Sequence, residues 1–166
     1  MNAVAAPRPV FPDAGYLYRE TAISVAINAV LSLIFFLLVF GTPASVRVAG
    51  AGGYGMDFVP QSLMIALMAS LVPGAIAAAK LRRAGLAAAA EARAALLRRS
   101  LATALLGAGV GAAIGWLFAL LLPVAAIPLM PALFAKILYG ALLAAIVTPI
   151  GLRRALRRPY RTKEPR

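Results

Sequence analysis

The chain has no cysteine and no histidine, and only 5 of its 166 residues are Asp or Glu. Without cysteine it can form neither a disulfide nor a thiolate nucleophile. Without histidine it lacks the usual imidazole base and the commonest ligand for metals and haem. No pair of carboxylates lies within an apolar run, and no glycine-rich phosphate loop with its lysine occurs. The sequence therefore predicts no enzyme activity and no cofactor.

Apolar residues are abundant instead. They make up 63% of the chain, against 13% charged residues, whereas soluble domains average roughly 45–50% apolar and about 25% charged residues. Four apolar runs, at about 21–41, 61–80, 101–122 and 132–152, each have the roughly 20 residues that a helix needs to cross a bilayer. We expect an all-α integral membrane bundle of four transmembrane helices in one domain, residues 21–152. Residues 1–20 precede this domain, and a basic tail, 153–166, follows it.

Basic residues separate sharply between the segments that flank these runs. Of the 17 Lys and Arg residues, all but Arg47 and Lys136 lie in the N-terminal segment, in the segment 80–100 that ends the second run and leads to the third, or after the fourth run. The positive-inside rule places these segments, and so both termini, in the cytoplasm. The chain would then form two hairpins of the same polarity. The arginines nearest the predicted spans are expected to contact anionic lipid headgroups, and they are Arg82, Arg83, Arg98, Arg99, Arg153 and Arg154. No recognised nucleic-acid-binding motif accompanies the charge, so we expect no nucleic-acid partner.

The two loops expected outside the membrane differ in composition. Residues 41–57, "GTPASVRVAGAGGYGMD", are rich in glycine and predict an irregular, mobile loop. Residues 123–131, "PVAAIPLMP", are uncharged and contain three prolines, which favours a position at the lipid interface or against a partner. Aromatic residues gather near this end of the runs, as in the belts found at membrane interfaces, and include Tyr54, Phe58, Trp116, Phe118 and Phe134.

The first run carries a polar row. Ser24, Asn28 and Ser32 follow Glu20 at intervals of four, so they share one helix face. An unpaired amide in hydrocarbon is unfavourable by several kcal/mol, so Asn28 must face protein or water. Two roles fit: hydrogen bonds that hold helices together, which we favour, and the lining of a path for a substrate or ion.

The third run carries a row of small residues at the same spacing. Gly107, Gly111 and Gly115 fall on one face, where the lack of side chains lets another helix approach closely. The sequence predicts tight helix packing here. The partner helix lies either in the same chain or in another subunit.

Three further features stand inside or beside the runs. Pro73 and Pro149 each remove one backbone hydrogen bond and predict helix kinks. Asp57 lies just before the second run and Lys136 about one turn into the fourth. Lys136 either extends alone to the headgroups or forms an ion pair with Asp57.

The segments "AISVAINAVLSLIFFLLVFG" and "DFVPQSLMIALMASLVPG" resemble small four-helix bacterial inner-membrane proteins that have no assigned activity. The resemblance covers residues 20–83 and implies a helical bundle in a bacterial inner membrane. The small multidrug exporters also have four helices, but their pattern needs an acidic residue well inside the first helix. Glu20 stands at the edge of the run, beside Arg19, and does not fit.

These observations predict a non-catalytic membrane protein. We expect an accessory or structural subunit, whose partners are membrane lipid and either further copies of the chain or other membrane subunits. The alternative is a small oligomeric transporter or channel.

Overall fold

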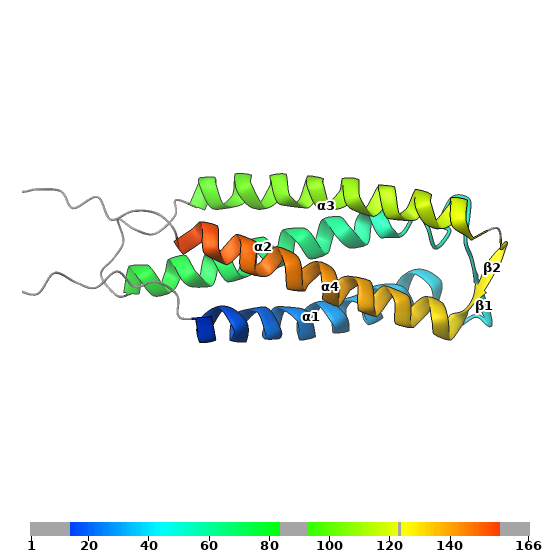
Figure 1. Cartoon of the computed structure of the whole chain (residues 1–166), viewed down its shortest axis with the longest axis horizontal. Helices are drawn as coiled ribbons and strands as arrows, with labels where there is room; N and C mark the ends of the chain where they lie inside the picture. The colour runs from blue at the N-terminus through cyan, green and yellow to red at the C-terminus, as the bar shows by residue number, and fades with distance from the viewer. Residues whose placement is uncertain (1–13, 84–92, 123, 157–166) are drawn as a thin grey trace, which may run out of the picture.

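The computed structural model describes residues 14–83, 93–122 and 124–156. They form four long helices, α1 (Ala14–Phe40), α2 (Phe58–Arg83), α3 (Arg93–Leu121) and α4 (Leu129–Leu156), and two short strands, β1 (Ser45–Arg47) and β2 (Ala126–Pro128). Figure 1 shows successive helices running in opposite directions. Each helix is long and apolar enough to cross a bilayer. The predicted helical fold with four candidate spans is thus confirmed.

Three helices extend beyond their apolar runs into basic sequence, α3 by about two turns at its start and α2 and α4 by about one turn at their ends. Lys80, Arg82 and Arg83 form the last turn of α2, and Arg153 and Arg154 lie in the last turn of α4. Cations suit these positions, because the C-terminus of a helix carries partial negative charge. We call the end of the molecule that holds these residues the basic end. The expected helical connector between α2 and α3 falls largely on residues 84–92, outside the described residues.

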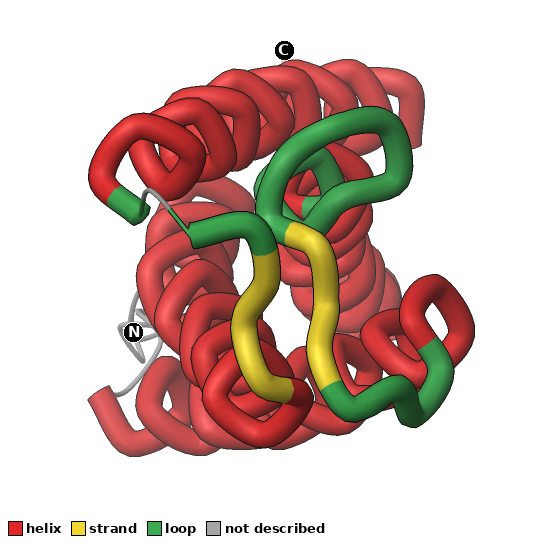
Figure 2. Tube along the Cα trace, turned by 90° about the vertical axis from the view of Figure 1, so that its right-hand side faces the viewer, coloured by secondary structure: helices red, strands yellow, loops and turns green. Residues whose placement is uncertain are grey.

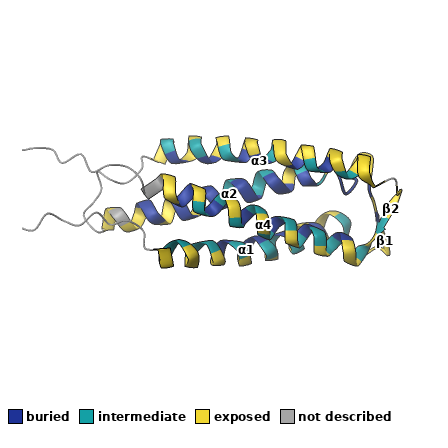
Figure 3. Ribbon diagram, in the orientation of Figure 1, coloured by how far each residue is buried: buried dark blue, intermediate teal, exposed yellow. Residues whose placement is uncertain are grey.

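The helices pack as a central pair with one helix on each side. α2 packs against α4, α3 packs against α2, and α1 packs against α4, whereas α1 and α2 touch only lightly. Figure 3 shows the buried residues concentrated along α2, as its central place requires. α1 and α3 each leave a broad face exposed, and both faces carry large apolar side chains.

The loop between α1 and α2 is more ordered than its composition predicts. β1 pairs with β2 in an antiparallel sheet, with Val46 opposite Ile127, and Figure 2 shows the two strands crossing one end of the bundle. Val46 and Val48 are buried, and the positive φ angles of Gly50 and Gly52 reverse the chain after them. The loop is thus irregular over most of its length, as expected, but it contains a short strand and two buried valines that its composition did not indicate. We call this end of the molecule the sheet end.

The second loop packs against the first loop of the same chain, through β2. The composition of residues 123–131 favoured the lipid interface or a partner. It did not predict this pairing, because strand pairing between such distant segments leaves no local signal. The aromatic residues also divide into two groups. Trp116 and Phe134 are exposed, as an interfacial belt requires, whereas Tyr54 and Phe58 are buried in the core at the sheet end.

Candidate functional site

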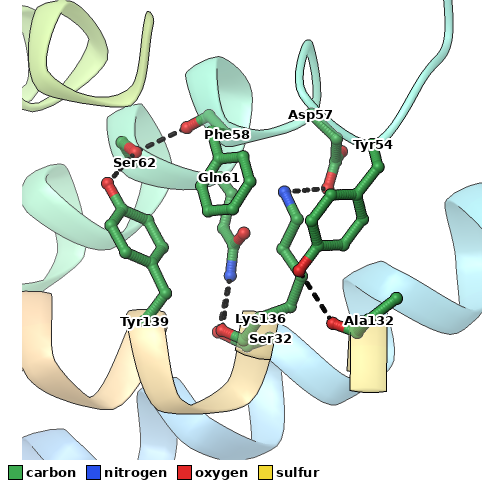
Figure 4. A network of polar contacts seen from close by, with 9 residues as sticks. All are labelled: Ser32, Tyr54, Asp57, Phe58, Gln61, Ser62, Ala132, Lys136 and Tyr139. Carbon is green, nitrogen blue, oxygen red and sulfur yellow. Dashed lines mark hydrogen bonds and ion pairs between the residues drawn. The ribbon is translucent and has the colours of Figure 1, made fainter. Parts of the chain in front are cut away.

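A polar and aromatic network joins α2 to α4 near the sheet end (Figure 4). At its centre is Lys136, whose side chain is 1% exposed. Its Nζ lies 2.9 Å from Oδ2 of Asp57 and 3.6 Å from the centroid of the Phe58 ring. Lys136 therefore forms the ion pair with Asp57 and does not extend alone to the lipid headgroups. A carboxylate and an aromatic face together compensate the charge of an ammonium that is removed from water.

Tyr54 connects this network to the loop between α1 and α2. Its hydroxyl donates a hydrogen bond of 2.9 Å to the carbonyl oxygen of Ala132, and its ring meets that of Phe58 edge to face at 5.3 Å between centroids. Burial raises the pKa of Tyr54 above its ordinary value, and the negative charge of Asp57 adds to the effect. Tyr54 therefore anchors the loop to the first turn of α4 as a neutral phenol.

Gln61 and Ser62 extend the network away from the sheet end. Nε2 of Gln61 donates to Oγ of Ser32 at 3.0 Å and to the carbonyl oxygen of Lys136 at 3.2 Å. The Ser62 hydroxyl donates to the carbonyl oxygen of Phe58. Because its single proton is used there, the hydroxyl of Tyr139, 2.6 Å away, donates to Ser62. Gln61 thereby connects α2 to both α1 and α4.

The polar row of α1 faces α4. Ser24, Asn28 and Ser32 are all buried, and Thr148 of α4 donates a hydrogen bond of 2.7 Å to Oγ of Ser24. Asn28 donates to the carbonyl oxygen of Ser24 within its own helix, at 2.8 Å. The opposing face of α4 repeats at the same interval of four, with the buried residues Lys136, Gly140, Ala144, Thr148 and Leu152. The two rows therefore meet along their length.

The glycines of α3 lie against α2 of the same chain. A Cβ placed on Gly107 would come within 2.6 Å of the Cβ of Ala66. One on Gly111 would collide with the carbonyl oxygen of Phe58, and one on Gly115 with that of Gly55, just before α2. Of the two partners that the sequence left open, the structure has the intramolecular one. By contrast, a Cβ on Gly109, on the other face, would meet nothing within 4 Å.

Several residues of the network escaped the sequence analysis, among them Gln61, Ser62, Tyr139 and Thr148. A signal was present for α2, where Ser62, Ala66, Ser70 and Gly74 repeat every four residues as the glycines of α3 do. The same count along the fourth run would have drawn attention to Gly140 and Thr148. No local signal marks Gln61, because its partners come from two distant helices.

The remaining predicted residues lie apart from the network. α2 continues through Pro73 and α4 through Pro149, so each proline is accommodated within one helix, and the expected kinks stay a prediction. Glu20 pairs with Lys80 at the basic end, with 3.4 Å between Oε1 and Nζ. The six arginines expected at lipid headgroups all lie at this end, where Arg99 is half-buried and the other five are exposed.

Two lateral openings flank the central helix pair. Between α1 and α2 there are two cavities of about 110 and 190 Å³, both bordered by Asn28. Between α3 and α4 a cavity of about 200 Å³ lies at the basic end. Within the described part of the chain, no three side chains of the metal-ligating types gather into a cluster.

Comparisons with known protein families, with curated proteins and with solved structures find no match for this chain.

Proposed function

We propose that the chain is a non-catalytic, multi-pass membrane protein that serves as a structural or accessory subunit of a homo-oligomeric or larger membrane assembly. The observation that supports this proposal is the use of its intramembrane polar groups. Lys136, Gln61 and Thr148 hold the chain's own helices together through ion-pair and hydrogen-bond contacts. A catalytic or conducting role needs such groups presented to a substrate, whereas a scaffold needs them paired.

The proposed setting is a bacterial inner membrane, with the basic end and both termini in the cytoplasm. The support is the concentration of Lys and Arg at the end where α2 and α4 finish. Single cysteines test the orientation, since the chain has none of its own. In intact spheroplasts, a membrane-impermeant maleimide should label Ser45→Cys, while Thr162→Cys should react only after lysis. The reverse labelling pattern would overturn the proposed orientation.

An assembly is favoured by the faces that the fold leaves uncovered. α1 packs mainly on α4 and α3 on α2, and their other faces expose large apolar residues such as Leu38, Leu106 and Trp116. Such faces can take up lipid or a neighbouring helix. Mass spectrometry of the protein extracted in mild detergent should detect one stoichiometric complex, and reconstituted liposomes should show no solute flux. A protein that remains monomeric at every concentration, with no co-purifying subunit, would contradict the proposal.

A transporter or channel formed by several copies is the second candidate, and one feature favours it. The cavity of about 110 Å³ between α1 and α2 borders Asn28 and Gln61, and the side-chain oxygens of both residues accept no hydrogen bond from the described residues. If this opening carries a solute, liposomes should show a flux that is lost in Asn28→Leu. Val30→Leu, at an exposed position of the same helix, is the control that should leave the flux unchanged.

A further inference from the structure

We propose that the cleft between α3 and α4 at the basic end binds the phosphate headgroup of an anionic membrane phospholipid, with an acyl chain lying along the apolar part of the cleft. The proposal requires that the chain lie in a membrane. It does not require any protein partner.

Two arginines from different helices line this cleft, Arg99 on α3 and Arg154 on α4. Arg99 is half-buried and Arg154 exposed. The guanidinium of Arg99 is directed toward α2, since a Cβ on Gly74 would lie 3.4 Å from its Nη2. Planar guanidinium groups suit phosphate oxygens, because each can donate two parallel hydrogen bonds. The cleft thus offers two guanidinium groups to a phosphate, one half-buried and one exposed.

The cleft changes from charged to apolar along the helix axis. Leu106 follows Arg99 by two turns on α3, and Val147 precedes Arg154 by two turns on α4. At a rise of 1.5 Å per residue, each apolar residue lies about 10 Å from its arginine, toward the middle of the bundle. A soluble anion would use only the charged part. A phospholipid matches both parts, because its headgroup and its acyl chain are joined in the same order.

The charge of this region also favours an anion. Arg98 and Arg153 lie beside the cleft arginines, and Lys80, Arg82 and Arg83 form the last turn of α2 at the same end. Basic pockets between helices on the cytoplasmic side of membrane proteins are recognised sites for anionic headgroups. The cavity of about 200 Å³ distinguishes this place from the exposed arginines around it.

The adjacent arginines provide a matched control. Arg98 and Arg153 precede the two cleft arginines by one position on the same helices, are exposed, and do not border the cleft. The double variant Arg98→Gln/Arg153→Gln removes the same charge from the same end as Arg99→Gln/Arg154→Gln. The general attraction to anionic lipid therefore falls equally in the two variants. A difference in lipid affinity between them would show a specific site.

The experiment titrates delipidated, full-length protein in mild detergent with phosphatidylglycerol or phosphatidylcholine. Native mass spectrometry reads binding, and the melting temperature reads stabilisation. We expect phosphatidylglycerol to bind the wild-type protein more tightly than phosphatidylcholine. Losing one arginine contact should weaken the affinity for phosphatidylglycerol by a factor of about five, so Arg99→Gln/Arg154→Gln should bind this lipid roughly 25-fold more weakly. The affinity of the control variant should change by less than about fivefold. If the double variant does not fold, Arg154→Gln alone serves as the test, because Arg154 is exposed and its substitution should not disturb folding. It should bind phosphatidylglycerol about fivefold more weakly.

Three outcomes would overturn the proposal. Equal losses in the cleft and control variants would show diffuse electrostatic attraction. Equal affinity for the two lipids would show that the charge of the headgroup is not recognised. Stabilisation by inorganic phosphate as large as that by phosphatidylglycerol, at equal concentration, would show a site for a free anion.

Discussion

The ammonium of Lys136 and the carboxylate of Asp57 lie 2.9 Å apart and connect the two helical hairpins. Removing one partner leaves the other charge buried and unpaired, which typically costs about 3–5 kcal/mol. We therefore expect Lys136→Met and Asp57→Asn each to lower the melting temperature strongly. The double variant Lys136→Met/Asp57→Leu should recover most of the loss, because no uncompensated charge remains. Additive losses in the double variant would contradict a coupled pair.

Gly111 lies where α3 approaches the carbonyl oxygen of Phe58 most closely. A leucine at this position must push the helices apart, and overpacking typically costs about 1–3 kcal/mol. We expect Gly111→Leu to lower the melting temperature of the purified protein. The control is Gly109→Leu, on the same helix with open space around it. It should be neutral or stabilising, because leucine is the better helix former and is compatible with lipid. Equal effects of the two substitutions would argue against tight packing of α3 on α2.

The hydrogen bond between Thr148 and Ser24 tests the role of the polar row in α1. Interhelical hydrogen bonds in membranes contribute on average about 0.6 kcal/mol and at most about 1.7 kcal/mol. In a double-mutant cycle, Ser24→Ala and Thr148→Val should show a coupling energy of this size in thermal or denaturant unfolding. The control is Thr103→Val, whose hydroxyl bonds the carbonyl oxygen of Arg99 in its own helix. It should show no coupling to Ser24→Ala.

The buried phenol of Tyr54 predicts a loss of stability in alkali. Its pKa in the folded state is raised above the ordinary value of 10.0. Folding therefore favours the protonated form, and the corresponding stability is complete below about pH 10. As the pH rises above 10, the unfolded chain loses this proton first, and the folded state loses stability. The melting temperature of the wild-type protein should fall more steeply between about pH 10 and 12 than that of Tyr54→Phe.

Tyr18→Phe provides the comparison for this pH dependence, because Tyr18 is 79% exposed. It should follow the wild-type profile, since this side chain stays in contact with solvent in the folded state. Parallel profiles for the wild-type protein and Tyr54→Phe would show that Tyr54 does not couple pH to stability.

The sequence by itself determined the number of helices and the packing face of two of them, α1 and α3. Four apolar runs long enough to cross a bilayer predict four helices, and the spacing of four in Ser24, Asn28 and Ser32, and again in the α3 glycines, identifies a face on each of two helices. These signals are local: helical periodicity and hydrophobicity depend on residues within one or two turns of each other. They can therefore be read without knowing where the neighbouring helices lie.

Only the tertiary structure decided which faces meet. Ser24 accepts a hydrogen bond from Thr148, Gly111 lies against the backbone of Phe58, and Lys136 forms an ion pair with Asp57. The partners in each pair are far apart in the sequence, so helical periodicity could not predict that they meet. The pairing of β1 with β2 is of the same kind, since it brings together two loops whose compositions predicted different environments. Several helices with equally small and polar faces could pair in more than one order. The order observed depends on the simultaneous fit of all four helices, a property of the whole fold and of no single segment.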